Sequence, residues 1–119
     1  MKEKRKTQRR YLLYYMRIYD TATRKQIGNL VDISSGGVMV IGEHLIPEGR
    51  TTHLRMELTH DVAKKPFMEF SARSKWCNPY ITPNLFNTGF EILDLAPEDA
   101  EIIQRINTVF GFHDNTPVN

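Results

Sequence analysis

Cysteine is almost absent from the sequence. Cys77 is the single cysteine among 119 residues, which excludes an internal disulfide and a cysteine-rich metal site. The four histidines lack the spacing that is typical of a zinc site, so we expect no bound metal. A chain that needs no disulfide fits a reducing compartment, and we expect it in the cytoplasm.

Long apolar runs and catalytic groupings are missing as well. The longest apolar runs, such as residues 37–41, are far shorter than the roughly 20 residues that cross a bilayer, so no membrane insertion is expected. The basic N-terminus lacks the apolar core and the cleavage site of a signal peptide. No G-x-S-x-G elbow or other pairing of nucleophile and base is present, so we expect no enzyme and no catalytic residue.

The sequence has little net charge overall, but its positive charge is concentrated at the N-terminal end. Sixteen Lys and Arg against 14 Asp and Glu leave a net charge of +2. The first ten residues hold six cations and one anion, a local charge of +5, so the remainder carries −3. We expect one globular domain, residues 11–113, between a flexible basic arm, residues 1–10, and a frayed tail, residues 114–119.

The sequence does contain a series of short strand signals. Apolar and aromatic residues cluster, or alternate with polar ones, over six segments bounded by turn residues. The expected strands cover residues 11–19, 26–33, 38–41, 51–58, 67–76 and 86–93. Pro79 and Pro83 predict a loop over residues 78–84, because proline has no N–H to donate to a sheet. Trp76 and Cys77 are expected in the core, without a ligand role.

One helix signal follows the last strand. Pro97 suits a first helical position, and Glu98 and Asp99 complement the positive end of a helix, which predicts a helix over about residues 97–110. Its apolar residues recur at helical spacing and should cover an open end of the sheet: Ile102, Ile103, Ile106, Val109 and Phe110. Six strands and one helix predict a mainly β fold, either a small antiparallel barrel or a strongly curled sheet.

The basic arm is the first candidate binding element. Its residues are too charged to be buried, so their function depends on the anion that they bind. Arginine can hold a phosphate with two hydrogen bonds and can also stack on a base. Arg5 and Arg9 are four residues apart and Arg10 follows, so a bend could turn two guanidinium groups toward one phosphorylated ligand. The alternative is a solvated tail.

A polar corner after the second expected strand is the other candidate. Asp32 and Ser34 should face one side of the chain, while the isoleucine between them enters the core. A carboxylate and a hydroxyl on one face can bind a nucleobase edge, and a carboxylate suits the N1–H and amino group of guanine. Gly36 and Gly37 let the chain turn sharply and let a ligand approach the backbone. The alternative is an Asx or Ser turn that caps a hairpin.

Together, in this order and at this separation, the two elements resemble the motifs of the PilZ domain family. That family has an R-x-x-x-R motif in an N-terminal arm, matched here by residues 5–9, and a D/N-x-S-x-x-G motif some twenty residues later, matched by residues 32–37. The resemblance covers nearly the whole chain. It implies a six-stranded antiparallel split β-barrel with a C-terminal helix, including a late Gly-Phe strand at Gly89 and Phe90.

The resemblance implies a receptor for the bacterial second messenger cyclic di-GMP, with no cofactor. Arg5 and Arg9 would hold phosphates and stack on guanine, with Arg10 as a supporting contact. In the alternative register, Lys6 and Arg10 would take the two arginine positions.

The corner would supply the other half of the site. Asp32 and Ser34 would bind a guanine edge, and Gly36 and Gly37 would complete the site, with Gly37 leaving room for the base.

The resemblance also implies signal transmission. Ligand binding would order the arm and change the surface presented to an unidentified effector protein, with motility or biofilm regulation as the family's usual outputs. One alternative is an adaptor of the same fold that binds protein without the nucleotide. Another is a nucleic-acid-binding barrel, but the net-negative body argues against a nucleic acid polymer. Both a monomer and a dimer remain open.

Overall fold

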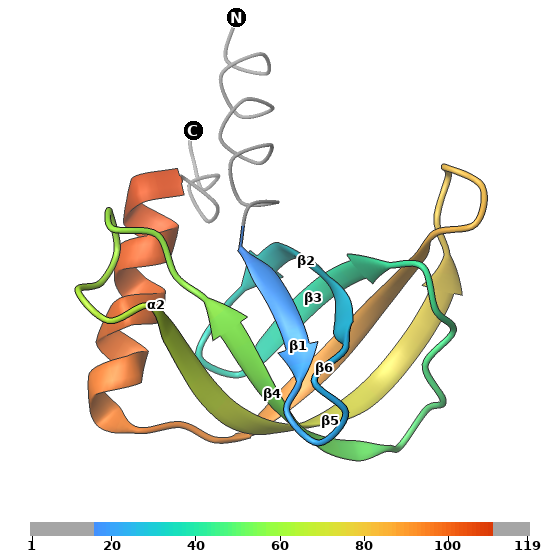
Figure 1. The fold of residues 1–119 in the computed structure, drawn as a ribbon, viewed down its shortest axis with the longest axis horizontal. Coiled ribbons are helices and arrows are strands. Elements are labelled where there is room, and N and C mark those ends of the chain that lie inside the picture. The colour runs from blue at the N-terminus through green and yellow to red at the C-terminus, as the bar shows by residue number, and fades with distance from the viewer. Residues whose placement is uncertain (1–15, 111–119) are drawn as a thin grey trace, which may run out of the picture.

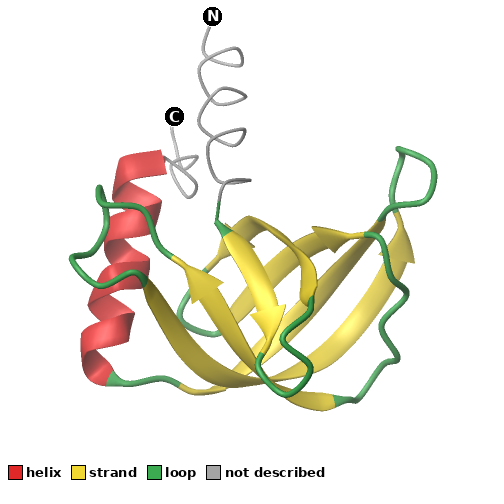
Figure 2. Ribbon diagram, viewed as in Figure 1, coloured by secondary structure: helices red, strands yellow, loops and turns green. Residues whose placement is uncertain are grey.

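Six antiparallel strands close into a barrel, and one helix packs at an end of it (Figures 1 and 2). The computed structural model describes residues 16–110. The strands are β1 (Arg17–Asp20), β2 (Gln26–Ile33), β3 (Gly37–Gly42), β4 (Thr51–Glu57), β5 (Phe67–Pro79) and β6 (Phe86–Asp94). Their order around the barrel is β1-β2-β3-β6-β5-β4, with β4 pairing back to β1. The helix, α2, spans Pro97–Phe110.

The predicted fold class, six antiparallel strands with a C-terminal helix, is confirmed. β2 and α2 have the predicted bounds. Of the two alternatives, the barrel is correct, because β1 pairs with β2 on one side and with β4 on the other. Residues 11–15 of the expected first strand lie outside the described residues, as do the arm, residues 1–10, and the tail, residues 114–119.

The predicted start of the loop after β5 is wrong by two residues. β5 continues to Pro79, which lies opposite Phe86. The next pair is joined by a hydrogen bond from the N–H of Tyr80 to the oxygen of Leu85, so the backbone nitrogen of Pro79 points away from β6. β4 does not extend to this level, because it begins opposite Arg73. The missing N–H of the proline therefore costs no ladder bond.

The barrel interior is filled by large apolar side chains from all six strands and from α2. The largest that are fully buried include Phe70, Met16, Ile18, Leu30, Ile33, Leu54, Met56 and Met68. From α2, Ile102, Ile103 and Ile106 join this core, as predicted. Val109 does not, since it is 39% exposed one turn beyond the buried face. The helix thus seals the barrel end through its first three turns.

An ion pair fixes the start of α2. Nζ of Lys65, on the loop between β4 and β5, lies 2.7 Å from Oδ1 of Asp99, which is only 5% exposed. Asp99 also lies in the first turn, where a carboxylate favours the helix dipole. Within residues 16–110, no helix is long and apolar enough to cross a membrane.

Candidate ligand-binding site at the β2–β3 corner

A β-bulge turns Asp32 outward. The partners of Leu30 and Asp32 are consecutive residues of β3, so Val31 is an extra residue in β2. Leu30 is fully buried, and without the bulge Asp32, two positions later, would point into the core as well. Instead Ile33 is 1% exposed in the core, and Asp32 lines a surface pocket. The predicted orientation of Asp32 and Ile33 is confirmed.

The corner itself is a tight hairpin. The N–H of Ser34 donates to the oxygen of Gly37 over 2.8 Å, and the N–H of Gly36 donates to Oγ of Ser34 over 3.3 Å. The oxygen of Gly36 accepts from the N–H of Ile92, which ties the corner to β6. The predicted Ser turn is therefore present. The Ser34 hydroxyl still has its own proton to donate, so this turn does not exclude a ligand contact.

The two corner glycines do not serve as conformational hinges. Among residues 16–110, Gly49 is the glycine with positive φ, at 82°, so neither Gly36 nor Gly37 uses a conformation reserved for glycine. A Cβ at Gly37 would lie 2.9 Å from the backbone oxygen of Phe90, whereas one at Gly36 would meet nothing within 4 Å. The prediction of a glycine-dependent turn is therefore wrong. A glycine is needed at position 37 because the backbone of β6 lies too close to β3 for a side chain to fit.

A second bulge lies in β5, across the pocket from Asp32. Ser74 pairs with Phe90 and Trp76 pairs with Gly89, so Lys75 is the extra residue. Ser74 is 1% exposed, and regular alternation would turn Trp76 inward with it. The bulge instead places Trp76 over the outer side of Gly89, next to the exposed Lys75. A cation and an indole thus stand side by side on the wall of the pocket.

A glycine in β6 makes room for this indole. A Cβ at Gly89 would lie 2.6 Å from Cζ2 and Nε1 of Trp76, closer than real Cβ atoms come. The indole therefore lies directly against the β6 backbone and is half-buried. The expectation that Trp76 belongs to the core is wrong. Gly89 is the sequence signal for this position, because a glycine inside a strand often marks a close approach to the backbone.

The two bulges line one pocket of 240 Å³, and Asp32 on its wall has an unpaired carboxylate oxygen. Asp32, Ser34, Lys75 and Trp76 all line this pocket. Oδ1 of Asp32 is buried and accepts no hydrogen bond from any group in the part of the chain that the structure describes. A buried acceptor in this state costs about 1–3 kcal/mol relative to one that is hydrogen-bonded.

The charges beside the pocket share a single carboxylate. Nζ of Lys75 lies 3.7 Å from Oε1 of Glu91, and Nη1 of Arg73 lies 3.8 Å from the same oxygen. All three side chains are about half exposed. With Asp32 included, two cations and two anions leave this wall without net charge.

The structure brings together one half of the predicted site. Asp32 and Ser34 line the pocket with Gly37, and Gly36 lies at the corner beside them. Arg5, Arg9 and Arg10 lie outside the described residues. Over residues 16–110, no group of three or more His, Cys, Asp and Glu side chains is placed to hold a metal ion.

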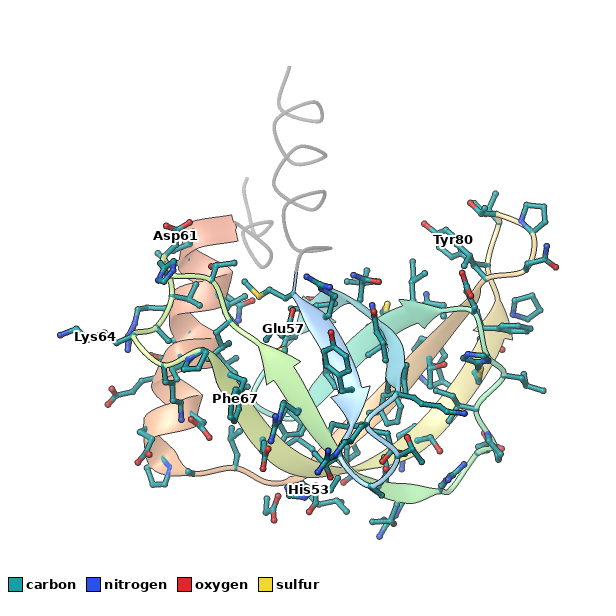
Figure 3. All side chains as sticks on the ribbon, viewed as in Figure 1. His53, Glu57, Asp61, Lys64, Phe67 and Tyr80 are labelled. Atoms are coloured by element: carbon teal, nitrogen blue, oxygen red, sulfur yellow. The ribbon has the colours of Figure 1, made fainter. Side chains whose placement is uncertain are left out.

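Two strongly exposed apolar residues lie outside this pocket. Ile81, at the tip of the β5–β6 hairpin, is 92% exposed, and Leu45 is 66% exposed. Tyr80, at the base of this tip (Figure 3), lines a second pocket that is also bounded by Gly42 and Glu43. Exposed apolar side chains can contact another protein where they form one contiguous patch.

These features define a small β-barrel domain whose indole-walled pocket at one hairpin corner is lined mainly by apolar residues, together with Asp32, Ser34 and Lys75. The chain belongs to the PilZ domain family, whose pattern matches residues 3–108. A search of curated proteins found no match to the chain.

Two solved structures show the same fold. The inhibitor of motility MotI/DgrA from Bacillus subtilis aligns with a TM-score of 0.63 and 13% identity, covering 86% of this chain and 48% of that protein. The PlzA protein from Borreliella burgdorferi, in complex with c-di-GMP, aligns with a TM-score of 0.53 and 14% identity, covering 87% of this chain and 47% of PlzA. The chain therefore spans about half the length of each protein, and at this identity the likeness concerns the fold.

Proposed function

We propose that the protein is a receptor for cyclic di-GMP and that the ligand binds in the pocket at the β2–β3 corner. The observation that carries this proposal is the buried, unpaired Oδ1 of Asp32 in a pocket walled by Trp76. Membership of the PilZ domain family supports it, and so does the c-di-GMP bound in the PlzA structure.

The pocket residues suit one guanine base. The Asp32 carboxylate can accept from the N1–H and amino group of guanine, and the Ser34 hydroxyl can donate to a base acceptor. The Trp76 indole offers a flat apolar surface on which a base can stack, a contact worth about 1–3 kcal/mol per base. Asp32 and Ser34 can contact the base but cannot neutralise phosphates, so the phosphates need cationic side chains.

The basic arm supplies these cations in our proposal. Arg5 and Arg9 hold the phosphates, and Arg10 supports them. Ordering the arm costs conformational entropy, which the arginine contacts must exceed. The ordered arm then presents a changed surface to an effector protein, which makes ligand binding the switch.

Calorimetric titration with cyclic di-GMP tests the proposal. We expect saturable binding to the wild type, and a loss of about tenfold or more for Arg9→Ala, because one charge-assisted contact is removed. Lys6→Ala serves as the matched variant for the motif register: it should bind almost normally if Arg5 and Arg9 form the motif. No heat and no rise in melting temperature at high micromolar ligand would show that the protein is not a receptor for this nucleotide.

A nucleotide-independent adaptor is the second candidate, and the exposed apolar residues at Ile81 and Leu45 favour it. In this case the barrel binds an effector through the β5–β6 tip, whatever the state of the pocket. Capture of the same effector in equal amounts with and without cyclic di-GMP is the expected result for an adaptor. Capture that requires the nucleotide, and that Asp32→Asn abolishes, supports the receptor instead.

A further inference from the structure

The pocket has a cation of its own that does not belong to the arm. Lys75 is the only cation among the residues of the described chain that line the pocket. It is there because the β5 bulge inserts it immediately before Trp76, so that both side chains lie on the outer face. Bulges that re-aim side chains are common next to binding sites.

We propose that Lys75 forms a phosphate subsite on the barrel wall and binds a phosphate of the nucleotide whose base contacts Asp32 and Trp76. This inference rests on the proposed receptor function, and it adds an anion contact on the barrel that does not depend on the arm. Lysine suits this role because its ammonium is a flexible point charge that can follow a phosphate without a fixed approach angle.

The ion pair of Lys75 with Glu91 is weak enough to leave the ammonium group available to a ligand. Its distance to Glu91 is 3.7 Å, longer than a hydrogen bond, and its side chain is 56% exposed. By contrast, Arg55 on the same sheet lies 2.7 Å from Glu69. Lys75 is therefore held loosely and can turn toward a ligand.

Arg73 removes the penalty for this movement. It lies 3.8 Å from the same Glu91 oxygen that Lys75 faces, so Glu91 keeps a cationic partner when Lys75 leaves. Arg73 does not line the pocket. Arg73 therefore neutralises Glu91 when Lys75 turns away, and Lys75 is then free to neutralise a phosphate.

Matched substitutions test this subsite by calorimetry with cyclic di-GMP. Lys75→Gln should weaken binding about tenfold, because one charged contact is lost. Lys64→Gln removes the same charge from the loop that packs against α2 (Figure 3) and should bind as the wild type does. Lys75→Arg keeps the charge and should retain most of the affinity. Glu91→Gln removes the competing anion and should tighten binding, by about threefold.

The outcomes separate this subsite from the receptor function. If the wild type binds and Lys75→Gln binds as tightly as Lys64→Gln, the subsite is wrong while the receptor function stands. If Lys75→Arg loses as much affinity as Lys75→Gln, the charge is not what the ligand uses, and the subsite is again wrong. If the wild type does not bind, the receptor function and the subsite both fail. All of these side chains are exposed, so unchanged melting temperatures are expected and confirm that the variants fold.

Discussion

Asp32 has a property that stability alone does not explain. Its Oδ1 is buried without a hydrogen-bond partner among residues 16–110, while the side chain faces a pocket and not the core. A buried carboxylate oxygen without a donor lowers the stability of the folded protein. Each unpaired buried group in a native protein needs an explanation, and for Asp32 the proposed one is a ligand that supplies the missing donor. Asp32 is therefore a residue at which ligand binding and the stability of the fold have opposite requirements.

Asp32→Asn should separate the two quantities experimentally. We expect at least tenfold weaker binding of cyclic di-GMP, because the amide loses the charge that pairs with the guanine donors. The melting temperature should stay constant or rise, because an unpaired amide oxygen costs less than an unpaired carboxylate. Calorimetry and thermal melting measure the two effects.

Asp61→Asn is the matched control for this substitution. Asp61 is exposed on the loop between β4 and β5 (Figure 3), so its variant should change neither quantity. A fall of several degrees for Asp32→Asn, with unchanged binding, would mean that Asp32 is a structural residue.

At the scale of the element, two bulges convert ordinary strands into the walls of a site. The bulge at Val31 turns Asp32 outward, and the bulge at Lys75 does the same for Trp76. The sequence predicts Asp32 on the surface, because neighbouring residues of a strand point to opposite sides and Ile33 is expected in the core. It does not predict Trp76 there, because a bulge depends on the register between two strands and leaves no mark in the periodicity of one.

Gly89→Ala should displace Trp76 from its position on β6. The added Cβ would lie 2.6 Å from two indole atoms, so the ring must move toward solvent. We expect a red shift of the tryptophan emission and weaker binding of cyclic di-GMP. Trp76 is the single tryptophan of the sequence, so its emission reports this site alone.

Gly36→Ala provides the comparison for the emission experiment. Its added methyl group meets nothing within 4 Å, so the emission of Trp76 should stay unchanged. Equal emission spectra for Gly89→Ala and the wild type would show that the indole does not lie against β6.

A cross-strand pair between β4 and β5 gives the barrel a pH dependence. Nε of Arg55 donates to Glu69 over 2.8 Å, and its guanidinium lies 4.0 Å from the ring centroid of Phe67. The hydrogen bond from Arg55 holds the pKa of Glu69 below its ordinary value of 4.5. A carboxyl with a lowered pKa in the folded state stabilises the protein above its unfolded pKa, and this stabilisation is lost as the pH falls through the folded pKa.

Arg55→Ala should therefore be less stable than the wild type by about 1 kcal/mol at neutral pH. The difference should narrow as the pH falls from 4.5 through the lower pKa that Glu69 has in the folded wild type, because the carboxylate that pairs with Arg55 is then protonated. Denaturant unfolding at neutral pH, and at the lowest pH at which both proteins still fold, measures the difference in the free energy of unfolding. Arg73→Ala, whose ion pair is longer at 3.8 Å, should lose less. A difference that widens in acid would contradict the assigned pairing.

At the scale of the whole molecule, α2 completes the core that the barrel leaves open at one end. Ile103 and Ile106 of α2 are at most 2% exposed, and they pack with residues of the barrel interior. This arrangement follows from the sequence, because helical spacing of apolar residues after six strands needs an apolar surface to cover. The exposed Val109 departs from the pattern, since periodicity shows which face is apolar but not how far the partner surface extends.

Ile106→Ala tests the contribution of this helix. The loss of a fully buried isoleucine should cost about 2–5 kcal/mol, a fall in melting temperature of roughly 8 °C or more. Val109→Ala, on the same helix but 39% exposed, should change the melting temperature by much less. Equal effects of the two substitutions would show that α2 does not seal the barrel.

A fluorescence titration reports directly on the binding of cyclic di-GMP at the β2–β3 corner against Trp76. The single tryptophan lies on the wall of the pocket, so ligand stacking must alter its emission. We predict a saturable change in Trp76 emission for the wild type, and for Asp32→Asn the same change only at ligand concentrations at least about tenfold higher. A flat titration of the wild type up to high micromolar cyclic di-GMP would contradict the account.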